Sequence, residues 1–589
     1  MEGIRMKKLA LAVVALTVIF ICSALMNFGT FKIPQSGWKP LGDASFYVDL
    51  GESRGVRCVY VFLSDEQRVC FDLYAGAPGS WKRVGKLDKS GDFCSWEKVN
   101  VRRETRFLKF EFQDSAGEIG EILVVSDDGK KIGVQAIISL NETNESLSHL
   151  IDEQDVATPP ITQKYGTYFD EIYFVRTAWE HLHFEEPFEW THPPLSKLII
   201  AFGILSFGMC SFAWRFPGLL AAAALIPLMF FFGRRLFGSS FAGLLCAFLI
   251  TFDFMHFTMA RLATGEIFIL FFTTLMFFFF FRYFDEAFEH GGGDVVAAHG
   301  SLSKSALRSL FLSVIVFGLA FSTKWNTAYS FAAVLVLLVL TLLKGAFGRE
   351  VTFTVVAGLL VAALIYMLSY VPYMLAGHGF YDVLRLQHSM YVYHATLTAT
   401  HPFSSPWWSW WLMTKPLWLY FNDLNGKVST IVCMGNPMIW WASIPFMIMT
   451  LIRLVRSRFS DKVSVFITIP FFLQWLPYAF ISRCLFIYHF ISNIPFMIFA
   501  TVYWLNWLCV GPSHPSLRRL GKVFVAAFLI AVVAFFVTFY PIISGIPVSP
   551  EYREALRWFE YKEETKAWLG WVFVSIPLRS YFRHLLPTI

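Results

Sequence analysis

The stretch YFDEIYFVR at 168–176, followed after a short gap by THPPLSK at 191–197, places the adjacent carboxylates Asp170 and Glu171 where a polar region gives way to a strongly apolar one. Apolar residues recur three and four positions apart along it: Ile172, Val175, Trp179 and Leu182. This spacing predicts an amphipathic helix over 170–182 that lies along an interface. The two carboxylates would then lie at a membrane surface.

The composition places most of the chain in lipid. Of its 589 residues, 56% are hydrophobic and only 16% are charged, whereas soluble proteins carry about 25% charged residues. The net charge of +6 comes in short clusters beside apolar runs, which favours membrane topology over nucleic-acid binding. The spacing of the nine cysteines fits neither a disulfide scaffold nor a metal site. Cys58, Cys70 and Cys94 could form one bridge and leave one thiol free.

The N-terminus has the pattern of a membrane span. Arg5, Lys7 and Lys8 precede an apolar run over 9–28 that is long enough to cross a bilayer. The rival interpretation is a cleaved signal peptide, but the run exceeds the roughly 7–15 apolar residues of such peptides and no clear cleavage site follows. We therefore expect an uncleaved first helix with its N-terminus in the cytoplasm.

Further apolar segments bring the expected number of transmembrane helices to about eleven. They lie at 216–233, 239–256, 265–283, 308–322, 327–343, 352–374, 435–453, 463–480, 485–508 and 522–541. Basic residues mark every second connection: Arg234 with Arg235, Lys304 with Arg308, Lys344 with Arg349, Arg453 to Lys462, and Arg518 with Arg519 and Lys522. If these connections are cytoplasmic, the Asp170 motif and segment 375–434 face outside.

A different pattern over about 45–136 predicts a separate soluble domain. Short strand-like segments at 45–50, 56–63 and 107–112 are separated by glycines and polar turns, which is typical of an antiparallel β-sandwich. The segments around Asp49, Tyr74, Trp81, Arg106 and Glu121 loosely resemble a discoidin-type, galactose-binding-like jelly roll. Sugar binding and a structural or docking role both stay open for this domain.

Ionisable residues on the predicted outer side are the candidates for chemistry, since such residues are expensive at a membrane. They are Asp170, Glu171, His192, Lys197, Arg215, Arg261, Glu266, Lys324, Arg483 and His489. A sheltered carboxylate can act as a general base toward a hydroxyl, and Arg or Lys can stabilise a phosphate leaving group. The set predicts group transfer from a lipid-linked phosphate. The alternative for any single residue is a buried ion pair.

Several motifs, in order from about 165 to 545, resemble the protein O-mannosyltransferase family of lipid-carrier-dependent glycosyltransferases. They are Phe169-Asp170-Glu171, the 191–197 stretch, Trp214-Arg215, Ala260-Arg261-Leu262, Ser322-Thr323-Lys324-Trp325, Tyr393-His394-Ala395 with Ser409-Trp410, Gly435-Asn436-Pro437, and Arg483 to His489. The resemblance implies a polytopic α-helical GT-C-type membrane fold, a dolichyl- or polyprenyl-phosphate-mannose donor, and inverting transfer to Ser or Thr hydroxyls on the extracytoplasmic face of the plasma membrane.

The resemblance also implies roles for individual residues. Asp170 matches the catalytic acid of the family, Glu171 its supporting neighbour, and Arg215 the arginine near the donor phosphate. The remaining donor-phosphate or substrate-binding candidates are His192, Lys197, Arg261, Glu266, Lys324, Arg483 and His489. No metal or other cofactor is expected. The expected partners are the lipid-linked donor, a protein or other surface acceptor and the membrane, and the resemblance is compatible with a homo- or hetero-dimer.

The expected organisation is a first transmembrane helix in 1–30, an extracytoplasmic β-domain at 40–140, a GT-C-type catalytic membrane domain at 160–545 and an extracytoplasmic tail at 546–589. Segment 375–434 is too short for the β-trefoil domain of eukaryotic members of the family, and the β-domain before Asp170 is an addition to them. Both departures favour a prokaryotic relative.

Other functions compete with this hypothesis. The same fold and motifs could move a sugar to a lipid, as in the related aminoarabinose transferases. A polytopic transporter with a sugar-binding outer domain is a further alternative. Transporters usually show pseudo-repeats and helices broken at mid-membrane, and the sequence shows no such halves. An adhesion protein that works through its β-domain would leave the Asp170 and His192 segments unexplained.

Overall fold

The computed structural model describes residues 2–40, 43–141, 145–290, 302–344, 348–424 and 426–557. The chain forms two units. We call Asn27–Trp179 with Ile200–Arg215 the sheet unit, and Met1–Met26 with Glu180–Ile199 and Phe216–Ile589 the helical unit. Most of the predicted tail at 546–589 lies outside the described residues, which end at 557.

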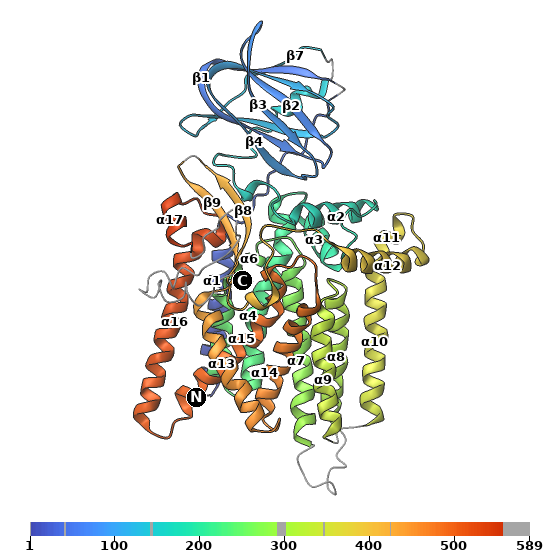
Figure 1. Ribbon diagram of the computed structural model, residues 1–589, viewed down its shortest axis with the longest axis vertical. Coiled ribbons are helices and arrows are strands. Elements are labelled where there is room, and N and C mark those ends of the chain that lie inside the picture. Colours follow the sequence, from blue (N-terminus) through green and yellow to red (C-terminus); the bar gives the residue numbers. More distant parts are fainter. Residues whose placement is uncertain are drawn as a thin grey trace. The chain divides into compact units, whose positions relative to one another are not determined.

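The sheet unit is built on an antiparallel sheet, as the alternating sequence pattern predicts (Figure 1). Its strands are β1 (Ser45–Leu63), β2 (Val69–Ala77), β3 (Ser80–Lys89), β4 (Ser95–Phe112), β5 (Ile119–Ser126), β6 (Lys131–Ile132) and β7 (Ala136–Ser139). The order is β3-β2-β4-β1-β5-β6, and β7 pairs with β1. Phe46, Val59, Phe71 and Phe110 lie in its apolar core. The all-β prediction is confirmed, and the likeness to discoidin domains stays a prediction.

The two longest strands differ from the prediction. Segments 45–50 and 56–63, predicted as separate strands, both belong to β1, which pairs with β4 on either side of a register shift between Asp49 and Arg54. Gly51 lies at this irregularity with a φ of 84°, which a residue without a Cβ adopts at little cost. The shift lets one strand bend and continue where the sequence pattern indicates a turn.

The helical unit contains the predicted membrane-spanning helices. Among the described residues of the chain, nine helices are long and apolar enough to cross a membrane: Lys7–Leu25, Ser211–Phe237, Glu266–Glu289, Lys304–Phe321, Arg349–Ser369, Pro437–Arg456, Lys462–Phe480, Ile487–Val510 and Pro515–Ser544. Two predicted spans correspond to shorter apolar helices, Ser240–Thr251 and Thr327–Leu343. The multi-pass membrane fold is confirmed, while the count of eleven stays a prediction.

The part of the chain that the structure describes contains ten long helices and seven shorter ones (Figure 1). The long helices are α1 (Glu2–Leu25), α4 (Ser211–Phe237), α7 (Glu266–His290), α8 (Lys304–Phe321), α9 (Thr327–Leu343), α10 (Arg349–Ser369), α13 (Pro437–Arg456), α14 (Lys462–Trp475), α15 (Ile494–Val510) and α16 (Pro515–Ser544). The shorter ones are α2 (Glu171–His183), α3 (Leu195–Phe207), α5 (Ser240–Thr251), α6 (Phe254–Met259), α11 (Val371–Leu375), α12 (Phe380–Thr396) and α17 (Pro550–Ala555).

Short elements connect these helices. The 3₁₀ turns are Glu145–Leu150, Gln163–Tyr165, Trp407–Ser409, Leu476–Phe480 and Ile487–Asn493, and a hairpin is formed by β8 (Leu417–Asp423) and β9 (Val428–Cys433). The amphipathic helix predicted over 170–182 is confirmed as α2, one residue later at each end, and its place along an interface stays a prediction. All nine cysteines lie in described parts of the chain and carry free thiols, so Cys58, Cys70 and Cys94 form no bridge.

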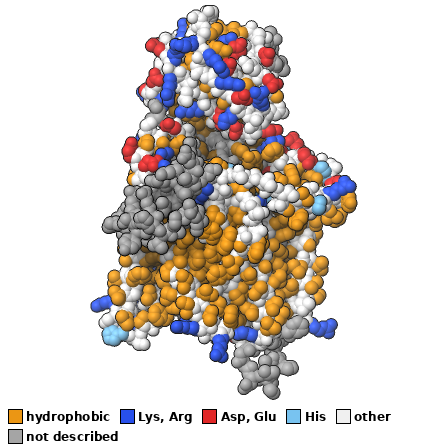
Figure 2. All heavy atoms as spheres, in the orientation of Figure 1, with side chains coloured by type: hydrophobic (Ala, Val, Ile, Leu, Met, Phe, Trp, Pro, Cys, Tyr) orange, Lys and Arg blue, Asp and Glu red, His pale blue; other side chains and the backbone are white. Residues whose placement is uncertain are grey.

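Apolar side chains cover the outside of the helices rather than only their packed faces. Figure 2 shows this apolar surface with Lys and Arg along one edge. Phe353, Leu360 and Ile530 are examples, each at least two-thirds exposed. Such a surface is stable when hydrocarbon rather than water surrounds it, because lipid imposes no penalty on exposed apolar groups.

Candidate functional site

Asp170 caps the helix α2. Its backbone carbonyl accepts hydrogen bonds from the amides of Tyr173 at 3.1 Å and Phe174 at 3.3 Å, which places it at the N-cap. Asp is among the residues favoured at this position. Phe169 precedes it with a φ of 54°, a left-handed conformation that is uncommon for an aromatic residue and is often found at functional sites. Asp170 is half-buried. A tight turn therefore fixes where its backbone enters the helix.

Glu171, the next residue, forms a fully buried ion pair with Arg215 at the start of α4. The guanidinium Nε donates to Oε1 at 2.8 Å and Nη2 donates to Oε2 at 2.7 Å, and neither side chain is exposed. The same guanidinium lies over the ring of Tyr168, 4.9 Å from its centroid. This bidentate geometry is the strongest form of the Arg–carboxylate interaction.

Arg215 also binds three backbone carbonyls of the sheet unit. Nη1 donates to Phe28 at 2.6 Å, and Nη2 donates to Gln163 at 3.0 Å and to Gly166 at 2.7 Å. All three of its nitrogens are thus engaged in the interior. The resemblance puts this arginine near a donor phosphate, but its surroundings suit a positioning residue that ties the segment before Asp170 to α4.

Arg261 has similar surroundings in the helical unit. Its Nη1 donates to the carbonyls of Ala24 and, at 2.8 Å, Met26, and its Nη2 donates to Ser544 at 2.8 Å. The side chain is buried, with its guanidinium 5.3 Å from the ring centroid of Phe257. It therefore joins the carbonyl ends of α1 and α16, and its predicted part in substrate binding stays a prediction.

A carboxylate that the motifs did not single out organises the 191–197 stretch. Glu189 accepts from Lys197 Nζ at 2.5 Å and from His192 Nδ1 at 2.8 Å. Lys197 Nζ also donates to the carbonyl of His192 at 2.7 Å. Burial raises the pKa of Glu189, but the charges of Lys197 and His192 outweigh it and hold that pKa well below its usual value. The available sequence signal is a carboxylate three residues before His192 and eight before Lys197.

Lys324 and Glu266 form a second ion pair in the helical unit. Lys324 Nζ lies 2.8 Å from Glu266 Oε1, at the first residue of α7, and 5.5 Å from the ring centroid of Tyr488. Their side chains are 12% and 9% exposed, so the pair is mostly buried but remains partly accessible. The ammonium retains hydrogen-bond capacity beyond its single carboxylate partner, since a lysine has three donors.

Arg483 and two histidines complete this group of charges. Arg483 Nη1 lies 2.9 Å from His394 Nδ1, and His394 Nε2 lies 2.8 Å from the carbonyl of Thr191. A neutral ring that donates through Nε2 and accepts through Nδ1 satisfies both contacts. Burial, with the nearby His192 and Arg483, lowers the pKa of His394 to about 4. His489 is buried and stacks on Trp410, with ring centroids 5.9 Å apart.

We call the helical-unit residues Glu189, His192, Lys197, Glu266, Lys324, His394, Arg483 and His489 the charged cluster. The rings of His192 and His394 lie 5.2 Å apart, and Lys324 is near enough to affect both histidines electrostatically. The prediction that His192, Lys197, Glu266, Lys324, Arg483 and His489 belong to one site stays a prediction. The structure pairs His192 and Lys197 with Glu189, Glu266 with Lys324, and Arg483 with His394, while His489 stacks on Trp410. Asp170 and Glu171 belong to the sheet unit, and Arg261 is bound to helix ends.

A groove adjoins the charged cluster at Arg483. Its volume is about 400 Å³, and its lining includes Thr398, Thr400, Ser404, Trp407 and Arg483. Hydroxyls, an indole and a guanidinium are suitable groups for a sugar or a phosphate. No group of three or more His, Cys, Asp or Glu side chains suited to a metal occurs within the described residues.

Two family models match consecutive parts of the chain. Residues 205–382 match the dolichyl-phosphate-mannose-protein mannosyltransferase family, and residues 379–562 match the C-terminal four-transmembrane region of protein O-mannosyltransferase. Lys324, Arg483 and the groove lie within the matched residues, whereas Asp170 and the sheet lie before them.

Known proteins resemble the chain over most of its length. A polyprenol-phosphate-mannose–protein mannosyltransferase of Mycolicibacterium smegmatis is 25% identical, over 65% of this chain and 84% of its own. The Mycobacterium tuberculosis protein of the same name is also 25% identical, over 71% and 89%. The S. cerevisiae protein O-mannosyltransferase Pmt1-Pmt2 complex bound to the sugar donor has a chain of similar fold. Its TM-score is 0.58 at 14% identity, over 71% of this chain and 91% of that one.

Proposed function

The chain belongs to the protein O-mannosyltransferase family with a GT-C-type fold, and we propose that it transfers mannose from a polyprenyl-phosphate carrier to Ser or Thr hydroxyls of proteins. The observation that carries this proposal is the charged cluster, in which Lys324 has one carboxylate partner for its three donors and Arg483 lines an open groove. Family membership supplies the sugar and the lipid carrier, and the cluster supplies a place for the carrier phosphate.

In the proposed reaction, the acceptor oxygen attacks C1 of the mannose from the face opposite the phosphate. The new bond joins that oxygen to C1, and the bond between C1 and the phosphate oxygen breaks with inversion at C1. The leaving polyprenyl phosphate keeps the electron pair. Asp170 takes the proton of the attacking hydroxyl, which raises the nucleophilicity of the oxygen as it forms its bond.

Cations are the complementary requirement, because negative charge develops on the departing phosphate. We propose Lys324 and Arg483 as the residues that stabilise it. Glu266 and His394 orient them through the contacts at 2.8 Å and 2.9 Å. His192, Lys197 and His489 complete the walls of the site, and Glu189 holds the first two in place. Glu171, Arg215 and Arg261 act as positioning residues in this proposal.

We propose that the charged cluster faces away from the cytoplasm, with the N-terminus inside a plasma-membrane protein. The ends of α7 support this orientation. Glu266 at its first residue pairs with Lys324, whereas Asp285 near its other end pairs with Arg235 and with Lys462. The latter two cations belong to the clusters that the positive-inside rule assigns to the cytoplasm. A homo- or hetero-dimer remains a prediction, which the mass of the purified protein tests.

Transfer in a defined system tests the proposed activity. The purified full chain in lipid nanodiscs is given polyprenyl-phosphate mannose labelled in the sugar, with a Ser/Thr-rich peptide or its Ala/Val counterpart. We expect label in the Ser/Thr peptide alone, and a loss of transfer when a nucleotide-linked mannose replaces the lipid donor. Label that appears only in a lipid product would contradict a protein acceptor. Transfer of a different sugar in preference to mannose would contradict the donor.

A further inference from the structure

A second cavity lies at the other end of the helical unit from the charged cluster. Arg234, in its wall, is adjacent to Arg235, which pairs with Asp285 near the end of α7. Glu266, which pairs with Lys324 in the cluster, is at the beginning of α7. At 1.5 Å per residue, Glu266 and Asp285 are about 28 Å apart along the helix, close to the thickness of a bilayer core. The cavity therefore lies near the opposite membrane face.

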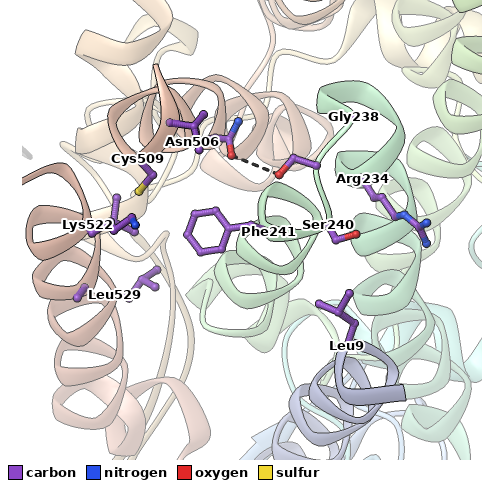
Figure 3. A pocket seen from close by; sticks show the side chains of 13 residues that line it. Leu9, Arg234, Gly238, Ser240, Phe241, Asn506, Cys509, Lys522 and Leu529 are labelled. Atoms are coloured by element: carbon purple, nitrogen blue, oxygen red, sulfur yellow. Dashed lines mark hydrogen bonds between the residues drawn. The ribbon is translucent and has the colours of Figure 1, made fainter. Parts of the chain in front are cut away.

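The cavity has a volume of about 710 Å³ and is lined by α1, α4, α5, α15 and α16. Figure 3 shows Lys522 and Arg234 on opposite sides, with Phe241 between them and Leu9 below. Apolar walls come from Leu9, Phe241 and Leu529. This combination of separated cations and apolar walls suits an amphiphile with a negatively charged head.

Among the side chains that the structure describes, the two cations of the cavity have no acidic partner. Within the described residues, neither Arg234 nor Lys522 forms a hydrogen bond or ion pair, and no residue lining the cavity carries a carboxylate. The neighbouring basic residues differ, since Arg235 pairs with Asp285, Lys462 with Asp285 and Glu289, and Arg453 with Asp461. An anion that enters the cavity is attracted by both positive charges.

Polar neutral groups also line the cavity. The Ser239 hydroxyl donates to Asn506 Oδ1 at 3.4 Å, the bond drawn in Figure 3. That bond uses the acceptor end of Asn506 and leaves its amide NH₂ as a donor. The Ser240 hydroxyl also lines the cavity. The cavity thus offers donors to phosphate oxygens, and the described residues that line it include no competing carboxylate.

We propose that this cavity binds the headgroup of an anionic glycerophospholipid, with its phosphate between Arg234, Lys522 and Asn506 and its acyl chains along Phe241 and Leu529. Charge complementarity selects the headgroup, because a zwitterionic lipid brings a cation of its own next to Arg234 and Lys522. The apolar walls select a lipid over a free phosphate. This lipid is separate from the mannose carrier, and its site stands whether or not the chain transfers mannose.

The test counts lipids on the purified full chain after delipidation, by native mass spectrometry. Phosphatidylglycerol, phosphatidylcholine, polyprenyl phosphate and inorganic phosphate are titrated separately. We expect retained phosphatidylglycerol, and at least about tenfold weaker binding in Arg234→Gln/Lys522→Gln, because both charge-assisted contacts are lost. The matched control Arg349→Gln/Arg519→Gln removes two exposed cations that do not line the cavity, and it should bind within twofold of wild type.

Several results would overturn the proposal. They are equal retention of phosphatidylcholine, equal phosphatidylglycerol binding by the cavity variant and its control, displacement of the bound phosphatidylglycerol by polyprenyl phosphate, and full competition by inorganic phosphate. If the double variant does not fold, Lys522→Gln alone replaces it, because Lys522 is exposed. The thermal midpoint without lipid checks folding, and no step of the test uses mannosyl transfer.

Discussion

Two Glu–cation pairs, one in each unit, have nearly the same length and very different surroundings. Glu171 and Arg215 lie 2.7 Å apart with no exposed side-chain surface, and Arg215 binds three carbonyls besides. Glu266 and Lys324 lie 2.8 Å apart with about a tenth of each side chain exposed. All three guanidinium nitrogens of the first pair have buried acceptors, whereas the ammonium of the second has one carboxylate partner for its three donors. We therefore propose that burial and donor use, rather than charge or motif position, distinguish a positioning cation such as Arg215 from a binding cation such as Lys324.

The largest expected effect comes from breaking the fully buried Glu171–Arg215 pair. Arg215→Met should destabilise the chain by about 3–5 kcal/mol, because it leaves the Glu171 carboxylate buried without a counter-charge. Removing that charge as well, in Arg215→Met/Glu171→Gln, should recover part of the loss. Thermal unfolding in nanodiscs measures both.

A matched control for Arg215 lies in the same unit. Arg54 pairs with Glu52, and both side chains are at least half exposed. Arg54→Met should change stability by only about 0–1 kcal/mol. A folded Arg215→Met protein of wild-type stability that only binds the donor less well would restore the phosphate-binding role given by the resemblance.

A change in the partly exposed Glu266–Lys324 pair should lower the rate of transfer rather than the stability of the fold. Lys324→Gln should lower kcat for transfer by about 100-fold, the size expected when one donor to a developing anion is lost. Lys462→Gln is the control, since Lys462 pairs with Asp285 and Glu289 at the other end of the helical unit. An equal loss in both variants would show that the effect is a general change of charge.

A change at Arg483 should weaken donor binding without a loss of stability, and we expect a smaller effect than at Lys324. It is half-buried, contacts His394 and lines the groove, so Arg483→Gln should raise KM for the lipid donor roughly tenfold with little change in thermal midpoint, as expected for loss of one charged contact. Arg385→Gln removes an exposed arginine of α12 and should leave KM unchanged. An unchanged KM in Arg483→Gln would remove Arg483 from the donor site.

The smallest expected effect is a pH slope. The folded-state pKa of His394 is about 4, below its ordinary value of 6.5. Between these values the unfolded chain binds a proton that the folded chain does not, so stability falls as pH falls from 6.5 to 4. His394→Gln should reduce the fall in thermal midpoint over this range, while His388→Gln, an exposed change on the same helix, should not. An identical slope in His394→Gln and wild type would contradict this protonation state.

The sequence pattern predicted the elements whose signals are local. The apolar spacing after Asp170 located α2 to within one residue, and the apolar runs located the long spans. The prediction of two separate strands at 45–50 and 56–63 was wrong. Gly51 and its polar neighbours have the composition of a turn, but β1 continues through them and pairs with β4 on both sides. Local composition does not distinguish a turn from a bulge that long-range pairing stabilises.

Long-range partners explain the rest of the difference. The resemblance predicts Arg215 and Arg261 beside a phosphate, which stays a prediction, and gives no sign of their carbonyl partners Phe28, Ala24 and Ser544, which are far away in the sequence. Glu189 had no motif of its own, and its role follows from folding the loop onto His192 and Lys197. The spacing of apolar residues predicts which face of a helix is apolar. It does not predict which cation becomes buried against segments that are distant in the sequence.

The most direct test of the central claim compares Asp170→Asn with Asp114→Asn in the transfer of labelled mannose from polyprenyl phosphate to a Ser/Thr peptide. Asn caps helices as well as Asp does, so Asp170→Asn preserves the start of α2 and removes the proposed base. Asp114 is an exposed carboxylate of the same unit. We predict a loss of about 100- to 10,000-fold for Asp170→Asn at an unchanged thermal midpoint, and no loss for Asp114→Asn. Equal activity in the two variants would contradict the assignment of Asp170 as the base.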